Sequence, residues 1–155
     1  MKKLIAGLMA SMALAATAQN PDVGDCYLFC HMSGSGEWTA YAISEDGIHF
    51  HDLLDGGPVF DTKEHAKIEG GTRDAYVCRS QDGKQFLMVT TDMCVGKSKK
   101  WDNYGINLYT SPDLINWKPV TFDFRQGAKI FSDPEAPDTY ADYSTVRRVW
   151  APQIL

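Results

Sequence analysis

From Gly70 to Cys78 the chain reads GGTRDAYVC, a change from a glycine-rich loop to the start of a strand. The two glycines mark the loop, and the run that begins at Ala75 has the aromatic and β-branched content of a strand. Asp74 lies at the junction, so a carboxylate is presented where the strand begins. An isolated Asp at such a junction usually caps backbone N–H groups, so its meaning depends on the surrounding segments.

Short strands and turns continue on both sides of this junction. Aromatic and β-branched residues alternate with Gly, Asp, Asn and Pro, and no segment has a sustained helical period. Asp-Gly turns at 45–47 and 81–83 are typical of β-hairpins, so the strands are predicted to pair antiparallel. The sequence predicts strands at 26–32, 38–44, 48–52, 76–80, 85–91, 106–111 and 117–122.

A repeat within these strands indicates the architecture. Asp46 and Asp113 each follow a Ser by two residues, and Phe50 and Trp117 each come six residues after that same Ser. In each unit the Asp is expected to fix the turn and the ring to pack back onto the sheet. Repetition of a strand-and-turn unit is the pattern of a β-propeller. The chain is therefore predicted to be all-β, built of antiparallel propeller blades.

Residues 1–18 have the three regions of a secretory signal peptide. Lys2 and Lys3 precede the apolar stretch 4–16, and small residues end at Ala18. The stretch is shorter than the ~20 residues needed to cross a bilayer. The sequence thus predicts an exported protein, periplasmic or extracellular, whose mature part is 19–155 and contains no membrane span.

The charge balance bears on the partners of the chain. The formal net charge is −5, and loss of Lys2 and Lys3 would make it more negative. An acidic chain disfavours nucleic acid as a partner. Aromatic rings and carboxylates instead suit neutral sugars, because rings stack on C–H faces and carboxylates accept hydrogen bonds from hydroxyls.

Four cysteines fit no zinc motif. Cys26 and Cys30 lie four apart on one predicted strand, so they share a face but are too far apart to bond. Buried, reduced thiols are expected, and Cys78 with Cys94 is the one pairing to test.

No metal or other cofactor is expected. His49 and His51 alternate on one strand without a third ligand in register, so they are predicted to face solvent. The acidic segment 133–138 is broken by Pro and lacks the ligand spacing of a calcium loop, so a plain loop is predicted.

Two further motifs accompany Asp74. The chain reads SPDLINW from Ser111 to Trp117, and WAPQ from Trp150 to Gln153. An Asp before a strand, an SxDLxxW hairpin and a WAP motif, in this order, resemble the opening of the catalytic domain of glycoside hydrolase family 43. The resemblance covers nearly all of 19–155. It implies a five-bladed β-propeller that cleaves arabinose- or xylose-containing polysaccharides or oligosaccharides. The chain departs from the family pattern at Ala75, where Pro is usual, and at Gln153, where an acid is usual.

The resemblance also implies an inverting mechanism with three acids. By motif order Asp74 is the general base, and Arg73 beside it is expected to bind substrate and to lower the pKa of Asp74. Trp150 then corresponds to a family Trp near the sugar-binding centre. Trp101, in the long loop at 92–105, is a candidate for stacking on sugar because such loops tend to carry binding groups. For both Trp residues the alternative is core packing.

Five blades of ~40 to 50 residues need more chain than is present. The resemblance therefore implies that 19–155 is the N-terminal portion of the domain, with the pKa-tuning acid and the general acid beyond residue 155. We expect the 155-residue chain by itself to be inactive and poorly soluble.

Two alternatives for the function stay open. One is a non-catalytic carbohydrate-binding propeller; the other is an invertase- or levanase-like fructosidase, which also has an Arg-Asp pair but whose Asn-Asp-Pro-Asn-Gly-like segment is missing here.

Overall fold

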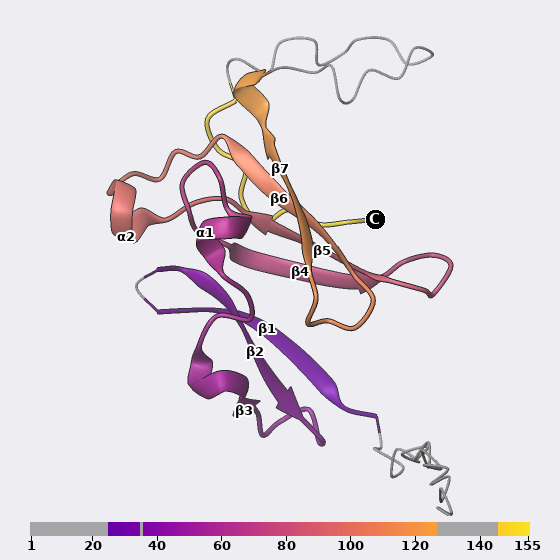
Figure 1. Ribbon diagram of the computed structural model, residues 1–155. Coiled ribbons are helices and arrows are strands. Elements are labelled where there is room, and N and C mark those ends of the chain that lie inside the picture. The colour runs from indigo at the N-terminus through magenta and orange to yellow at the C-terminus, as the bar shows by residue number, and fades with distance from the viewer. Residues whose placement is uncertain (1–24, 35, 127–145) are drawn as a thin grey trace, which may run out of the picture.

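A computed structural model describes residues 25–34, 36–126 and 146–155, so the predicted signal peptide and the acidic segment 133–138 lie outside the described residues. Two antiparallel sheets dominate the described part (Figure 1). The first contains β1 (Tyr27–Ser33), β2 (Trp38–Ser44) and β3 (His51–Asp52), and the second contains β4 (Arg73–Arg79), β5 (Phe86–Thr91), β6 (Gly105–Ser111) and β7 (Lys118–Asp123). Four short helical turns accompany the strands: η1 (Leu53–Gly56) and α1 (Thr62–His65) connect the two sheets, α2 (Val95–Ser98) connects β5 to β6, and η2 (Phe124–Gln126) follows β7.

Each sheet is a meander whose strand order is the chain order, as in a propeller blade. The predicted all-β class and antiparallel blades are thereby confirmed. Strand boundaries agree within two residues except at two places. The strand predicted at 48–52 is reduced to β3, because the turn after Ser44 extends to Phe50. The strand predicted at 76–80 begins already at Arg73.

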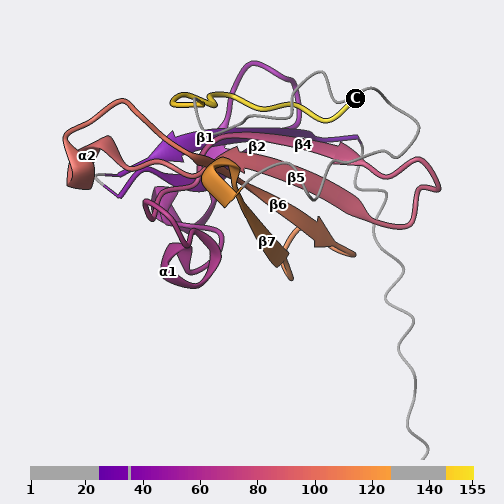
Figure 2. The same cartoon turned by 90° about the horizontal axis from the view of Figure 1, so that it is seen from above.

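The second sheet is twisted, so that β7 is turned away from β4 (Figure 2). None of the helices in the described ranges has the length and apolar character needed to cross a membrane.

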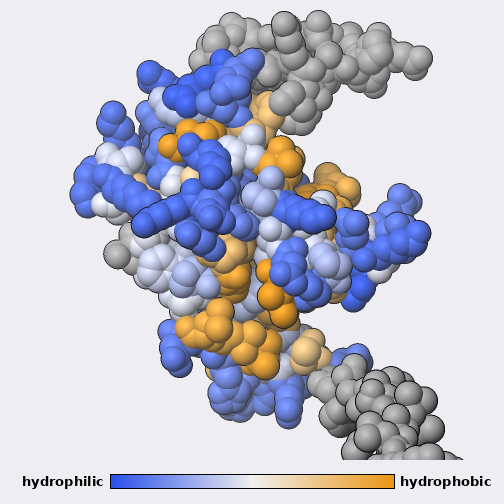
Figure 3. Space-filling view, viewed as in Figure 1, coloured by the Kyte–Doolittle hydropathy of each residue, from blue (hydrophilic) through white to orange (hydrophobic). Residues whose placement is uncertain are grey.

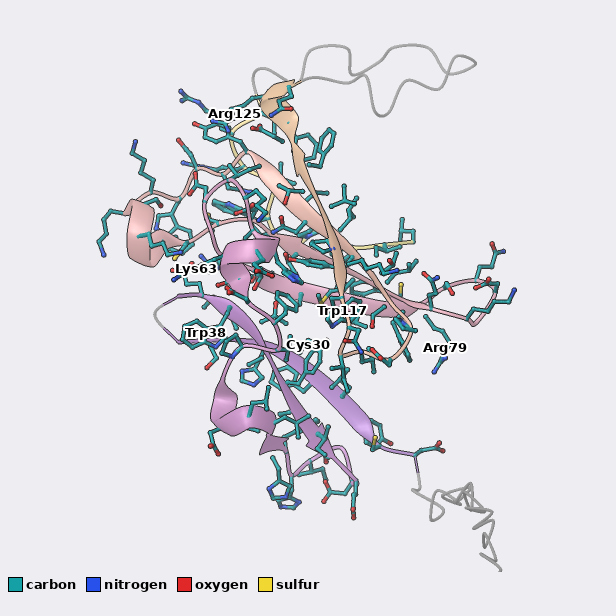
Figure 4. The ribbon with its side chains drawn as sticks, viewed as in Figure 1. Cys30, Trp38, Lys63, Arg79, Trp117 and Arg125 are labelled. Carbon is teal, nitrogen blue, oxygen red and sulfur yellow. The ribbon has the colours of Figure 1, made fainter. Side chains whose placement is uncertain are left out.

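The core lies between the two sheets. Tyr41 of the first sheet packs with Met88, Tyr109 and Trp117 of the second, and all four are buried. Trp117 Nε1 donates to the Tyr41 hydroxyl at 3.1 Å, so the core contains a polar link between sheets. Figure 4 shows Trp117 and Cys30 between them. Because the two sheets pack face to face, the side chains that each sheet directs into this core layer are mainly apolar.

A second link joins the beginnings of β2 and β4. The Thr39 N–H donates to the Thr72 hydroxyl at 2.9 Å, and the Thr39 hydroxyl donates to the Thr72 carbonyl at 2.6 Å. Both threonines are buried. Because Thr72 immediately precedes Arg73, this pair sets the position of the loop-to-strand junction relative to the first sheet.

The repeated Ser-x-Asp turn has the same geometry in both sheets. The Ser44 hydroxyl donates to Asp46 at 2.9 Å, and the Ser111 hydroxyl donates to Asp113 at 3.0 Å. Each Asp then accepts two backbone N–H groups from the residues that follow, at 2.7–2.9 Å. The predicted turn role of both carboxylates is confirmed.

The two packing rings behave differently. Trp117 is 7% exposed, whereas Phe50 is 40% exposed and touches Phe29 edge-on at 5.6 Å between ring centroids. Trp117 reaches the space between the sheets. Phe50 stays at the surface beside Phe29, and on the face seen in Figure 3 apolar side chains gather over the first sheet. The prediction of a packing ring therefore holds fully only for the second sheet.

The Asp113 turn makes stability dependent on pH. The Asn116 N–H and side chain, and then the Ile115 N–H, hold the pKa of Asp113 well below its usual 3.8. A carboxyl with a lowered folded pKa stabilises the fold above its unfolded pKa, and this contribution is lost as the pH falls. We expect Asp113→Ala to lower the Tm at pH 7, and the deficit to shrink below about pH 4. Thermal unfolding of both proteins at several pH values measures this. Glu45→Ala, an exposed carboxylate in the companion turn, is the control, and a deficit independent of pH would contradict the assignment.

The four cysteines all lie in the described part, and no disulfide joins them. Cys78 pairs with Leu87 near the hairpin that joins β4 to β5, whereas Cys94 follows the other end of β5, so the two lie at different heights along the sheet. Burial raises the pKa of the Cys30 thiol to about 11. The prediction of buried thiols is confirmed for Cys94 alone; Cys30 and Cys78 are half-buried, and Cys26 is exposed like the first three residues of β1 that follow it.

Candidate functional site

The loop that leads to Arg73 is organised by Asp92. This carboxylate is fully buried just beyond the end of β5. Its Oδ1 accepts the N–H groups of Glu69 at 2.9 Å and Gly70 at 3.0 Å, and its Oδ2 accepts that of Ile68 at 3.0 Å. Three backbone donors on one carboxylate fix the loop without a regular helix or strand.

The two glycines of this loop are needed for separate reasons. Gly70 has φ +81°, a left-handed conformation that side chains rarely adopt. A Cβ on Gly71 would collide with the Met93 carbonyl, so the loop passes directly against the segment after β5. The glycine-rich sequence thus allows the chain to approach β5 closely before β4 begins.

Asp74 sits in a β-bulge. Arg73 pairs with Thr91 and Tyr76 with Val89, so two residues of β4, Asp74 and Ala75, stand opposite one residue of β5. Asp74 has φ +53°, which Asp tolerates better than most side chains but which still costs about 1 kcal/mol or more. Its side chain is exposed. The bulge therefore holds a carboxylate at the surface in a backbone conformation outside the regular ladder.

Arg73 does not pair with Asp74. Its Nη1 lies 3.2 Å from Glu37 Oε2, with both side chains only 12–13% exposed, and no ion pair joins Arg73 to Asp74 within the described ranges. Arg73 was predicted to lower the pKa of Asp74, but its ion-pair partner is Glu37, so the prediction names the wrong carboxylate. Glu37 belongs to the β1–β2 turn, and its carbonyl accepts the Thr72 N–H at 3.0 Å, so sheet packing delivers this carboxylate to Arg73.

Glu37 also holds the start of α2. Its Oε2 accepts the Val95 N–H at 3.0 Å and its Oε1 accepts the Gly96 N–H at 2.8 Å. One carboxylate thus connects the β1–β2 turn, the beginning of β4 and the long loop that carries Trp101. Nothing in the local sequence marks Glu37 for this role, because its partners are distant in the chain.

Arg73, Trp101 and Trp150 come together as the sequence predicted, and Arg148 joins them. The Arg73 guanidinium carbon lies 5.3 Å from the Trp101 ring centroid, and the two indoles meet edge-to-face at 6.0 Å. The Arg148 guanidinium carbon lies 5.5 Å from the Trp150 ring centroid. We call these four residues the Arg–Trp cluster. Trp101 is 55% exposed and Trp150 45%, so both indoles keep free surface.

Asn103 secures the segment that carries Trp150. It is fully buried; its N–H donates to the Arg147 carbonyl at 2.8 Å, its Nδ2 donates to the Val149 carbonyl at 2.9 Å, and its Oδ1 accepts the Val149 N–H at 2.8 Å. The Ala151 N–H donates to the Thr91 hydroxyl at 3.0 Å, and Thr91 is the strand partner of Arg73. These bonds place Trp150 beside the Arg73-Asp74 junction. Sequence reasoning missed Asn103, whose only signal is a polar residue in a long loop.

A separate polar cavity of about 480 Å³ lies between α1 and β7. Its lining includes His65, Lys67 and Arg125 but no residue of the Arg–Trp cluster and not Asp74. His65 stacks on Phe60 at 4.4 Å between ring centroids, and burial lowers its pKa, so it is a neutral packing ring at pH 7. We place the candidate site at the cluster, because its Arg73 directly precedes the exposed Asp74 and contacts the half-exposed Trp101, which in turn meets Trp150.

The predicted exposure of the two histidines is also found. His49 is exposed and its ring lies 2.6 Å from Asp46 in the first Ser-x-Asp turn, and His51 is exposed at the start of β3. Both are far along the chain from the cluster; His49 belongs to the turn and His51 to β3.

The side chains around Asp74 have the chemical groups needed to bind a sugar. Half-exposed indole rings offer apolar faces for the C–H side of a pyranose or furanose ring. Guanidinium and carboxylate groups beside them can donate to and accept from hydroxyls. An exposed carboxylate next to such a surface can also accept a proton from water.

Comparison with known proteins agrees with this chemistry. A family model described as "Probable glycosyl hydrolase domain" matches residues 22–155. An alpha-L-arabinofuranosidase of Bifidobacterium longum subsp. longum is 30% identical over 130 residues, which cover 78% of this chain and 12% of the relative. The chain therefore spans a small part of the length of that relative. No solved structure matches the chain significantly.

Proposed function

Because the chain belongs to the family of probable glycosyl hydrolase domains related to glycoside hydrolase family 43, we propose that it provides the general base and part of the sugar-binding surface of an inverting glycosidase. The proposed substrates are arabinose- or xylose-containing polysaccharides or oligosaccharides. The observation that carries the proposal is the meeting of Arg73, Trp101 and Trp150 beside Asp74, although these residues come from three distant segments.

In this proposal Asp74 removes a proton from the water that attacks the anomeric carbon. Inversion requires that the general acid stand ~6.5 to 9.5 Å from the base, so that a water fits between the base and the sugar. The exposed position of Asp74 in the bulge supports this role, because the carboxylate is accessible to water and substrate. We propose that two further carboxylates, a general acid and a pKa-tuning acid, complete the active site, and that the whole protein is exported.

Trp101 and Trp150 are proposed to stack on the sugar, with Arg73 as a positioning residue for Trp101. The buried Glu37–Arg73 pair supports the positioning role, because it holds the guanidinium 5.3 Å from the Trp101 ring. A non-catalytic carbohydrate-binding domain is the second candidate. The cluster itself favours it, since stacking and hydrogen bonding bind sugar without any proton transfer.

The binding surface is tested by replacing each indole. We expect Trp150→Ala and Trp101→Ala to weaken the binding of arabino- or xylo-oligosaccharides ~10-fold each, corresponding to about 1.4 kcal/mol. The Tm should fall less than on removal of a buried ring such as Trp117, because both rings are about half exposed. Isothermal titration and thermal unfolding measure the two effects.

A matched control is Phe29→Ala. Phe29 is 52% exposed, close to the two Trp residues, but lies on the first sheet. Its replacement should leave sugar binding unchanged. If the Trp variants lose several degrees of Tm and bind sugar normally, the rings are packing residues and the proposed surface is wrong.

A further inference from the structure

The Arg–Trp cluster lies in a basic part of an acidic chain. The formal net charge of the whole chain is −5, yet residues 97–103 and 146–151, which carry Trp101 and Trp150, contain five basic side chains and one acidic side chain. The acidic one, Asp102, is already paired with Arg148 at 3.1 Å. Lys97 extends the basic surface to the loop before Arg73, because its Nζ donates to the Gly70 carbonyl at 2.9 Å. A neutral sugar would need none of this positive charge.

Arg148 has an unusual arrangement for a surface side chain. It is 60% exposed, but its orientation is held by Asp102 at Nε and by the face of Trp150. The bond to Asp102 uses one of the five guanidinium N–H donors. Within the described residues, no hydrogen bond is made by its two Nη groups. These two Nη groups can therefore act as a fork that binds a planar carboxylate through two parallel hydrogen bonds.

The position of this fork relative to the other charges is informative. The contacts run in the order Arg73, Trp101, Trp150, Arg148, so Arg148 is joined to Arg73 through the two indoles and forms the other end of this series of contacts. Arg73 is neutralised by the buried Glu37, and Asp74 would repel an anion beside it. A negatively charged group is therefore favoured at the Arg148 end and disfavoured at the Asp74 end.

We propose that the cluster recognises a uronic acid unit of the glycan, with Arg148 binding the sugar carboxylate while Trp150 stacks on the ring. The inference deepens the proposed function and rests on it, since it names the substrate class of the same surface. Arg148 is a specificity-determining residue in this arrangement. Asp102 and the Trp150 face keep its guanidinium in place before the sugar binds, so little side-chain freedom is lost on binding.

The test compares two ligands that differ in one group. Methyl β-D-glucuronide carries a carboxylate where methyl β-D-glucoside carries a hydroxymethyl group. Titrated into the purified chain at low salt, the glucuronide is expected to bind ~10-fold more tightly. Because both partners are exposed, the preference should fall markedly when salt is raised to ~0.5 M.

Arg148→Gln removes the charge and keeps most of the side-chain length. We expect it to reduce the preference to ~2-fold or less, because the affinity for the glucuronide should fall more than the affinity for the glucoside. Arg148→Lys keeps the charge without the fork and should give an intermediate preference. The matched control is Arg79→Gln. Arg79 also stacks on an aromatic ring, Phe86, at 4.3 Å, but at the opposite end of β4 (Figure 4), and its loss should leave the preference intact. Thermal unfolding of each variant confirms that it is folded.

The outcomes separate the inference from the proposed function. If both glycosides bind equally and Trp150→Ala weakens both, uronic acid recognition is overturned and the sugar-binding surface stands. If neither glycoside binds to the folded chain, the inference and the proposed surface both fail. If acetate competes as well as the glucuronide, the site is a simple anion site and the inference is overturned.

Discussion

Replacing Asp74 with Asn is expected to lower the turnover of arabinosides or xylosides at least ~100-fold, because the amide cannot accept the proton of the attacking water. The fold should be unaffected. Asn tolerates the left-handed backbone that Asp74 adopts at φ +53°, so the bulge survives the substitution. Asp74→Ala is a poorer test, since Ala at this φ adds backbone strain to the loss of the carboxylate.

The measurement is the kcat on aryl arabinosides and xylosides, made in a polypeptide that carries this chain together with a complete set of acids. Asp82→Asn is the matched control, an exposed carboxylate in the β4–β5 hairpin at the other end of β4. Near-normal turnover in the Asp74 variant would sink the assignment of the general base. Sugar binding that persists without any hydrolysis, in the variant and in the parent protein alike, would favour the non-catalytic alternative.

Loss of the Asp92 carboxylate is expected to have the largest effect on stability. Asp92→Ala leaves three backbone N–H groups without their acceptor in a region that is largely withdrawn from water, and each such donor costs about 1–3 kcal/mol. A loss of about 3 kcal/mol or more is expected in denaturant unfolding. Sugar binding should also fall, because the released loop leads directly into Arg73 and Asp74.

Asp92→Asn separates the loop effect from general destabilisation. Its amide oxygen can replace Oδ1 and keep the bonds from Glu69 and Gly70, while the bond from Ile68 is lost. An intermediate loss of stability is therefore expected. The control is Asp61→Ala, an exposed carboxylate that accepts one N–H, from Lys63, and whose loss should cost about 1 kcal/mol. Full stability and full sugar binding in Asp92→Ala would show that the loop is held by other contacts.

Some of the features tested by these experiments could be predicted from the sequence, and others could not. The strands, their antiparallel pairing and the two Ser-x-Asp turns were predictable, because alternation, Asp-Gly turns and an Asp two residues after a Ser act between residues a few positions apart. Motif order was enough to choose Asp74, Arg73 and Trp150, and the long loop pointed to Trp101. The structure brings Arg73, Trp101 and Trp150 together, while the catalytic and binding roles stay predictions.

The sequence by itself determined the all-β class, the turn chemistry and the residues from which a site can be built. Only the tertiary structure decided the partner of Arg73, since Glu37 reaches it through the packing of one sheet on the other. The same holds for Asn103, which brings Trp150 to the junction through bonds to a segment more than 40 residues away. Local geometry is encoded in neighbouring residues, but an ion pair or an aromatic contact between distant segments depends on how whole sheets and loops pack. For that reason the chemistry could be anticipated from the chain, and its electrostatic surroundings could not.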